Sequence, residues 1–312
     1  MQHKGKRKSE RRDRLLYIPN NAGKRRATVL FLLPSLIGVI GFCLLPILAS
    51  AVFSLMDYDL LMPMNAMKFV GFSNYTRILT GSEFPKVLGH TCTYLILYLP
   101  LIMLTSVGEA LILNKSFRGH GLFRTICYTP VITSWVAAAV VWQWVLSGKY
   151  GLLNQMLAGI GITGPAWLNS KDWAMPGVVI AAVWKDTGYY ALMVLAALKS
   201  IDPTCYEAAD IDGAGGFKKL TAITLPLISP TLFLLIVINV IYGLQVFDSV
   251  LIMTNGGPGG ATTVFLERIY KYAFKQYKMG IASAYSWILF TLILVFTAIQ
   301  FRLQGKWVNY DA

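Results

Sequence analysis

A few ionisable and amide side chains interrupt long apolar stretches of this sequence, and their chemistry could serve a function. They are Glu109, Gln143, Lys185, Asp186, Asn239, Gln245 and Asp248. Such groups are costly in lipid, so they tend to face a protein interior or a water-filled path. Carboxylates and amides form hydrogen bonds with hydroxyl groups, so these residue types suit a polar solute.

Helical spacing groups some of these residues on common faces. Asp186 lies within one turn of Tyr189 and Tyr190, and Asn239 recurs with Tyr242 and Gln245 at intervals of three. The predicted substrate path is Asp186, Tyr189, Asn239, Tyr242, Gly243, Gln245 and Val246. Alternatively, Asn239 and Gln245 bond across helices for packing, each contributing roughly 0.6–2 kcal/mol, and Gly243 leaves room for cargo or for a neighbouring helix. Glu109 and Asp248 lie nearer to stretch ends and are weaker candidates.

The sequence carries no motif for catalysis or nucleotide binding. No Gly-x-x-x-x-Gly-Lys-Ser/Thr stretch occurs, and the glycine and lysine cluster at 215–219 lacks the spacing that wraps a phosphate. Three histidines and four cysteines lie far apart, so their spacing predicts neither a metal site nor a disulfide framework. We therefore expect no catalytic, metal or cofactor site in this chain, which would not be an enzyme.

The apolar stretches themselves predict an all-α membrane protein. Of 312 residues, 55% are hydrophobic and 14% charged, whereas soluble domains carry about a quarter charged residues. A helix of roughly 20 apolar residues crosses a bilayer, and the first stretch is too long for a signal peptide. Kinks are expected at prolines, such as Pro100 and Pro130. The predicted spans are about 27–56, 87–113, 125–147, 173–198, 227–253 and 279–303, between cytoplasmic tails at 1–26 and 304–312.

The distribution of basic residues orients these spans. With the N-terminus inside, the cytoplasmic segments hold 18 Lys and Arg and the outer loops nine, so both termini are predicted to be cytoplasmic. The basic tail before Ala27 is interpreted as a topology determinant attracted to anionic lipid rather than a nucleic-acid-binding segment. The outer stretch Val264–Gly280 is basic but amphipathic, so a helix lying on the outer membrane surface is expected there.

The cytoplasmic loop 199–226 has more structure than a simple linker. Asp202-Pro203 is a helix start, and a glycine at 213, 215 or 216 can end that helix. A second short helix is expected at about 217–223, stopped before Pro226. The loop could be a solvated acidic connection, but its apolar residues favour a docking surface. They are Ala208, Ala209, Ile211, Ala214, Phe217 and Leu220.

This loop resembles the EAA loop of ABC importer permeases of the carbohydrate-uptake type. The similarity lies in the run Tyr206–Ala214 and in Ile223–Pro226, with further resemblance at Phe69–Tyr75, Trp184-Lys185 and Thr254–Thr263. The last stretch looks like the maltose-permease-like partner of the family's heterodimers. The resemblance covers about 30–303.

The resemblance implies a fold, a membrane and partners. The fold would be a MetI-like bundle of six helices in the bacterial cytoplasmic (inner) membrane. The partners would be a second homologous permease, two ATPase subunits that bind ATP and Mg, and an extracytoplasmic solute-binding protein that delivers a sugar or oligosaccharide. The residues that would couple to the ATPase are Tyr206, Glu207, Ala208, Ala209, Asp212, Gly213, Ala214, Leu225 and Pro226.

Two other functions stay open at this point. The same type of importer could carry glycerol phosphate, which would favour a cationic cavity, and Lys185 is the only basic residue in the middle of a predicted span. A channel or carrier that works without an ATPase would need no partner at the loop.

Overall fold

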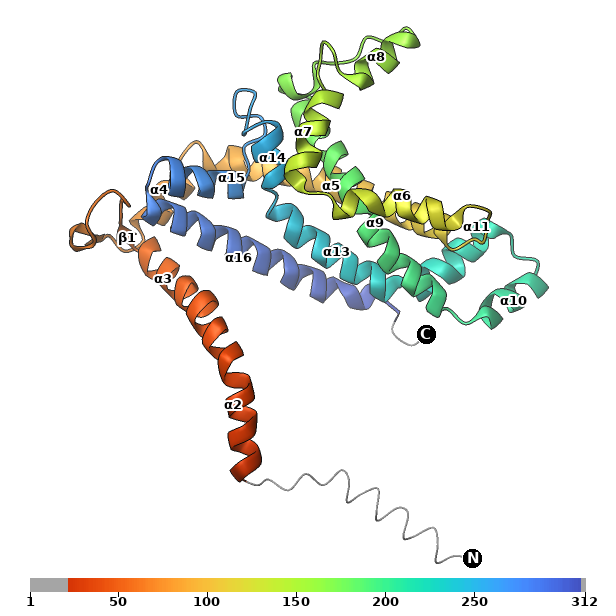
Figure 1. Cartoon of the computed structure of the whole chain (residues 1–312), viewed down its shortest axis with the longest axis horizontal. Coiled ribbons are helices and arrows are strands. Elements are labelled where there is room, and N and C mark those ends of the chain that lie inside the picture. The colour runs from red at the N-terminus through yellow and green to blue at the C-terminus, as the bar shows by residue number, and fades with distance from the viewer. Residues whose placement is uncertain (1–21, 310–312) are drawn as a thin grey trace, which may run out of the picture. The chain divides into compact units, whose positions relative to one another are not determined.

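The computed structural model describes residues 22–309 and divides into two compact units, Met1–Val52 and Phe53–Ala312 (Figure 1). Most of the predicted basic tail, 1–21, and the last three residues of the predicted C-terminal tail lie outside the described residues.

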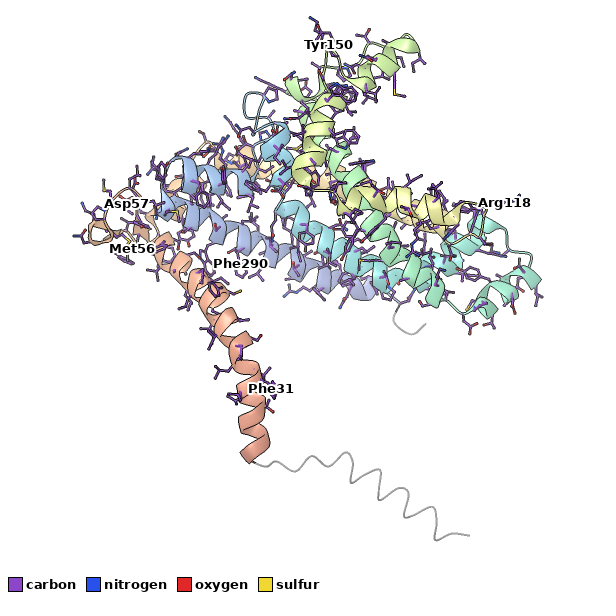
Figure 2. The ribbon with its side chains drawn as sticks, viewed as in Figure 1. Phe31, Met56, Asp57, Arg118, Tyr150 and Phe290 are labelled. Carbon is purple, nitrogen blue, oxygen red and sulfur yellow. The ribbon has the colours of Figure 1, made fainter. Side chains whose placement is uncertain are left out.

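The described part of the first unit is one long helix that runs just past the unit's end. It comprises α2 (Ala22–Val39), the π-helix η1 (Ile40–Leu44) and α3 (Leu45–Ser54). Proline at 46 has no N–H to continue an α-helical ladder, and the π turn before it bonds the Leu45 N–H to Ile40 O. Apolar side chains such as Phe31, which is 84% exposed, project from this helix (Figure 2). Residues 28–54 are long and apolar enough to cross a membrane.

A small cap opens the second unit. It holds the antiparallel pair β1 (Met56–Asp57) and β2 (Lys68–Phe69), the 3-10 turn η2 (Met64–Ala66) and α4 (Ser73–Thr80). The Asn74 amide donates to Ser54 O and Met56 O, both at 2.9 Å. A Cβ on Gly280 would lie 2.2 Å from Met56 O, so this glycine lets the last long helix begin against the cap.

The core forms around two long helices, α5 (Phe84–Leu113) and α9 (Ala174–Ser200), which pack along their lengths (Figure 1). Their facing residues include Ile102, Val178, Ala181 and Ala182, all essentially inaccessible to solvent. A second cluster joins α5 to α13 (Ser229–Leu244) and α16 (Met279–Leu303). These helices agree with the predicted helical fold class.

Two of the predicted spans are sharply broken rather than continuous. Within the predicted span 125–147, α6 (His120–Ile132) meets α7 (Trp135–Val145) at 102°. At the start of the predicted span 227–253, the helix Gly216–Leu227 meets α13 at 69°. α13 ends again before α14 (Asp248–Met253). Among the described residues, four helices are long and apolar enough to cross a membrane, or up to six if each bent pair counts as one span.

The breaks do not simply follow the prolines. α5 passes through Pro100 as a single helix, and α6 likewise continues past Pro130 to Ile132. Thr133 is then extended, and the Ser134 hydroxyl accepts the Val136 N–H at 3.2 Å to start α7. A side-chain cap that begins a new helix therefore fixes this bend.

The stretch 264–280 is largely helical and packs on the core of the second unit. It forms α15 (Phe265–Tyr270) and the π-helix η5 (Lys271–Lys275). Phe265 is fully buried against Phe84 and Tyr285, with ring centroids 6.0 and 6.4 Å away. Its apolar side is used for packing on α5 and α16.

Buried charge and hydrogen bonds stabilise the region around α15. Arg268 Nε lies 3.1 Å from Glu83 Oε1, and the Tyr272 hydroxyl donates to Glu83 Oε2 at 2.7 Å. Burial and this bond raise the pKa of Tyr272 to about 12. Glu267 is also fully buried, paired with Lys271. Gly256, at φ +81°, lets the loop 254–263 fold closely over the Glu267 carboxylate.

Shorter elements complete the second unit. In the segment between α7 and α9 lie α8 (Leu152–Gly159) and the 3-10 turn η3 (Trp167–Asn169), and η6 (Gln304–Lys306) follows α16. The loop after α9 contains α10 (Pro203–Ile211), α11 (Gly216–Lys219), the π-helix η4 (Leu220–Thr224) and α12 (Leu225–Leu227).

Candidate functional site

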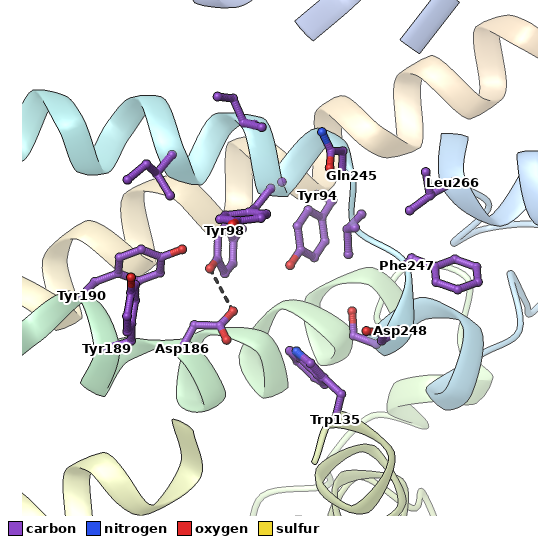
Figure 3. A pocket seen from close by; sticks show the side chains of 16 residues that line it. Tyr94, Tyr98, Trp135, Asp186, Tyr189, Tyr190, Gln245, Phe247, Asp248 and Leu266 are labelled. Atoms are coloured by element: carbon purple, nitrogen blue, oxygen red, sulfur yellow. Dashed lines mark hydrogen bonds between the residues drawn. The ribbon is translucent and has the colours of Figure 1, made fainter. Parts of the chain in front are cut away.

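A cavity of about 650 Å³ opens where α13 breaks before α14, facing α5 and α9 (Figure 3). Transporter sites are typically built at interrupted helices of this kind. The lining residues are Tyr94, Tyr98, Trp135, Asp186, Tyr189, Tyr190, Ile238, Ile241, Tyr242, Gly243, Gln245, Val246, Phe247, Asp248, Ser249 and Leu266.

One wall of the cavity combines a carboxylate of α9 with tyrosines of α5. The Tyr98 hydroxyl donates to Asp186 Oδ2 at 3.0 Å. The Tyr94 and Tyr98 rings are stacked with centroids 5.3 Å apart, which follows from their i, i+4 spacing on one helix. Tyr189 and Tyr190 extend this wall along α9, and Tyr189 is 48% exposed. The wall therefore offers a carboxylate, phenol groups and aromatic faces.

The opposite wall comes from the break between α13 and α14. Tyr242, which is 63% exposed, belongs to the last turn of α13, while Gln245, Val246 and Phe247 form the non-helical connection. Asp248 begins α14 and is exposed. The break therefore places polar and aromatic side chains next to backbone that is not helical.

Six of the seven residues expected along the substrate path line this cavity, and Asn239 is the exception. Asn239 is fully buried, and its amide donates to Leu235 O, 2.8 Å away on its own helix. This position differs from the expected one, and the bond lies within α13 rather than across helices. Gly243 lines the cavity, but a Cβ there would lie 2.7 Å from Leu95 Cδ1, so the glycine is also needed for close packing of α13 on α5.

Sequence reasoning missed most of the aromatic lining and undervalued Asp248. Tyr94 and Tyr98 recur at helical spacing within an apolar stretch, which was a usable signal. Trp135 and Phe247 had no such signal, because only the breaks in the two spans bring them to the cavity.

Lys185, next to Asp186, points away from the cavity. The Lys185 ammonium donates to Val131 O at 2.9 Å and lies 5.7 Å from the Trp135 ring centroid. It thus satisfies a carbonyl at the end of α6, where the helix stops. The side chain is buried, with 5% of its residue surface exposed. Consecutive residues on a helix point about 100° apart. Asp186 can therefore line the cavity while Lys185 bonds to the end of α6.

The other two intramembrane candidates also lie outside the cavity. The Gln143 amide donates to Ile252 O at 2.7 Å and to Met253 O at 3.2 Å, which fastens α7 to α14. Glu109 lines a separate, mostly apolar groove with Cys127 and Trp184.

The loop 199–226 forms a bent elbow. The Asp202 carboxylate accepts the Thr204 N–H at 2.9 Å, which caps α10 and lowers the pKa of Asp202. Gly213 takes φ +70°, so that its own N–H bonds Asp210 O and the Ala214 N–H bonds Ala209 O. This bond pair is the Schellman ending of a helix. Of the three candidate glycines, Gly213 therefore ends α10.

Side-chain contacts hold the two arms of the elbow together. The Tyr206 hydroxyl lies 2.9 Å from Thr224 Oγ1, and Asp210 pairs with Lys219. Ile211 and Phe217 are exposed, with 88% and 79% of their surfaces accessible to solvent. Among the predicted coupling residues, Ala209 is buried and Ala214, Leu225 and Pro226 are half-buried, whereas Glu207, Ala208, Asp212 and Gly213 are exposed.

The second arm of the elbow does not stop before Pro226 as expected. It continues through the π-helix η4 and α12 to Leu227. The Leu225 N–H bonds to Leu220 O, five residues back. Proline therefore falls in the first turn after the π segment, where its missing N–H is tolerated.

Comparisons with known proteins agree with this architecture. Residues 105–308 match the family described as binding-protein-dependent transport system inner membrane component. The trehalose/maltose transport system permease protein of Thermococcus litoralis is 36% identical over 277 residues, covering 88% of this chain and 92% of that protein. The sulfoquinovosyl glycerol transport system permease protein of Agrobacterium fabrum is 31% identical over 281 residues, covering 90% and 91%.

A solved structure matches over nearly the whole chain. It is a bacterial alginate ABC transporter in complex with its alginate pentasaccharide-bound periplasmic protein, whose matching chain has a TM-score of 0.78 and 26% identity, with 96% of each chain covered. Together with the matched family and the apolar helices, this likeness gives the MetI-like permease fold. The chain belongs to the binding-protein-dependent transport system inner membrane components, the membrane permeases of ABC importers.

Proposed function

We propose that this chain is one of two permease subunits of an ATP-driven importer and passes a sugar or oligosaccharide across the membrane. The observation that carries this proposal is the cavity at the α13–α14 break, where Asp186 and tyrosine rings meet. Carboxylates bind sugar hydroxyls, and aromatic faces stack on sugar rings. The relatives reported above are named for trehalose and maltose, for sulfoquinovosyl glycerol and for alginate, all carbohydrates or their derivatives.

The proposed topology has six spans with both termini in the cytoplasm. Each bent helix pair then contributes one span, the second through α13 with Gly216–Leu227 in the elbow, and the excess of Lys and Arg in the N-terminal tail and alternate loops supports the orientation. The elbow 199–226 would face the cytoplasm.

The proposed role of the elbow is to dock on an ATPase subunit, which binds ATP and Mg. The contacts that join its two arms support this role, as do the bare side chains of Ile211 and Phe217, because exposed apolar groups on a braced turn are suited to burial by a partner. The further partners would be a second homologous permease and an extracytoplasmic solute-binding protein.

The mechanism would be a shift between two populations of one assembly. ATP binding would draw the ATPase subunits together, and the elbow would pass that movement to α9 and α13, the helices that flank it. The cavity would then open outward to receive cargo from the binding protein, and hydrolysis would return it to an inward-open state.

Uptake by proteoliposomes tests this function. The vesicles would contain this chain with its partner permease and ATPase subunits and enclose ATP and Mg, while the binding protein and a radiolabelled disaccharide are added outside. We expect accumulation of the sugar that stops when the ATPase subunits are omitted. Accumulation by this chain alone, without nucleotide, would instead identify an independent carrier.

A further inference from the structure

We propose that the cavity at the α13–α14 break selects cargo by charge, accepting neutral or cationic saccharides and rejecting anionic ones. This inference rests on the proposed function and adds the charge class of the solute. It is derived from the charges that face the cavity, the charge that is turned away from it, and the aromatic groups between them.

The charges that face the cavity are all negative. Asp186 and Asp248 contribute carboxylates from two different elements, α9 and α14 (Figure 3). None of the 16 described residues that line the cavity is Lys, Arg or His. A phosphate, sulfonate or uronate entering this space would meet two carboxylates and no cation from this chain, and juxtaposed like charges oppose binding.

Lys185, the basic residue next to Asp186 in the sequence, bonds to a backbone carbonyl and does not line the cavity. The Lys185 ammonium is bonded to Val131 O and lies 5.7 Å from the Trp135 ring centroid. Bringing it into the cavity would leave the carbonyl at the end of α6 without this donor. A cationic lining, which a phosphate-bearing cargo would favour, is therefore absent from this wall.

The two carboxylates differ in how much of their hydrogen-bonding capacity is free. Asp186 Oδ2 accepts from the Tyr98 hydroxyl, which leaves Oδ1 available. The exposed Asp248 side chain forms no hydrogen bond or ion pair within residues 22–309. Carboxylate oxygens are acceptors only, so they suit a cargo that brings donors, such as hydroxyl or ammonium groups.

The aromatic lining favours the same class of cargo. Seven of the lining residues carry aromatic rings, and the faces of such rings attract cations as well as apolar sugar faces. They are Tyr94, Tyr98, Trp135, Tyr189, Tyr190, Tyr242 and Phe247. An amino sugar would gain from both the carboxylates and the rings, and a neutral sugar from hydroxyl bonding and stacking.

Direct binding to the purified complex tests the inference without the binding protein, which could impose its own selection. The complex of this chain with its partner permease and ATPase subunits would be titrated by equilibrium dialysis with three radiolabelled trisaccharides. One is built of neutral hexoses, one of hexosamines and one of uronic acids. We expect the uronate Kd to exceed the neutral Kd by about tenfold or more, a modest value for a like-charge penalty.

Two isosteric variants, Asp186→Asn and Asp248→Asn, assign the selection to these residues. The readout is the ratio of uronate to neutral Kd, which a general loss of structure would not move in one direction. We expect each variant to shrink this ratio several-fold and to weaken hexosamine binding. Asp57→Asn, at an exposed position outside the cavity, is the matched control and should leave the ratio unchanged.

The outcomes separate this inference from the function on which it rests. Equal or tighter binding of the uronate by the unmodified complex, or ratios unmoved by both cavity variants, would overturn the charge selection alone. Failure of all three trisaccharides to bind would overturn the saccharide cargo, and the charge selection with it.

Discussion

Single side chains join the broken helices of this permease. Gln143 is an example, because its amide nitrogen reaches two consecutive carbonyls, Ile252 O and Met253 O, at the end of α14. In a poorly hydrated region such carbonyls have few other partners. One amide therefore satisfies two backbone groups and joins parts of two different spans.

Replacing Gln143 by leucine should destabilise the protein. Leucine has a similar size but cannot donate, so both carbonyls lose their partner, at a cost of roughly 0.6–2 kcal/mol. The measurement is the midpoint of thermal unfolding in detergent. Gln155→Leu is the matched control, because the Gln155 amide makes one exposed bond to Tyr150 O, and its loss should be nearly neutral. Equal midpoints for the two variants would show that the α7–α14 link adds no stability.

The helices depend on a few glycines that let their backbones approach. A Cβ on Gly188 of α9 would lie 2.3 Å from Cys127 O of α6. At this distance the two helices cannot keep their present separation. Gly108 of α5, by contrast, has open space around its Cβ position.

Gly188→Ala should therefore separate α6 from α9, whereas Gly108→Ala should be tolerated. Forcing a methyl group into packed structure typically costs about 1–3 kcal/mol, and here the obstructing atom is backbone and cannot rotate away. Yield after detergent extraction and the unfolding midpoint would report the difference. Similar behaviour of the two alanine variants would contradict the close contact.

Gly213 supports a second matched comparison, in the elbow. Neither Gly213 nor Gly215 has an atom within 4 Å of its Cβ position, but only Gly213 has a positive φ. Valine at 213 would force a left-handed conformation that costs roughly 1–2 kcal/mol, so the bend should open. We expect Gly213→Val to abolish sugar-stimulated ATP hydrolysis by the assembled importer and Gly215→Val to retain it. Full coupling in the Gly213 variant would argue against a rigid elbow.

The long helices and the elbow could be predicted from sequence, but the breaks could not. Uninterrupted apolar stretches and the Asp202-Pro203 start are local signals. The bend after Ile132 has only one weak local signal, the Ser134 cap of α7, because serine is also tolerated in continuous membrane helices. It becomes visible only with Lys185, from another helix, placed on the freed carbonyl of Val131. Trp135, one of the cavity residues that were missed, follows from this nonlocal cause, whereas Phe247 follows from the separate break between α13 and α14.

The complete chain is expected to cross the membrane six times, which places the cap and the elbow on opposite sides. Asp57 in β1 and Asp212 at the end of α10 are both exposed and so serve as reporters. Their separation across the bilayer follows from the asymmetry of basic residues rather than from any contact within the fold.

Cysteine labelling in intact cells tests this arrangement. In a background with the native cysteines at 43, 92, 127 and 205 replaced by alanine, Asp57→Cys should react with a membrane-impermeant maleimide added outside. Asp212→Cys should react only after the membrane is permeabilised. Labelling of both positions from outside, or of Asp212→Cys alone, would contradict the proposed orientation.

The bare side chains of Ile211 and Phe217 also bear on how the cell makes this protein. A newly inserted copy that is not yet assembled with the ATPase subunits exposes two large apolar side chains on a turn. Quality-control proteases and chaperones recognise surfaces of this kind. Unassembled copies would then be recognised for degradation through Ile211 and Phe217, the side chains that the proposed docking would bury. Degradation of unassembled permease would then keep the amounts of permease and ATPase subunits balanced, even if the two are synthesised at different rates.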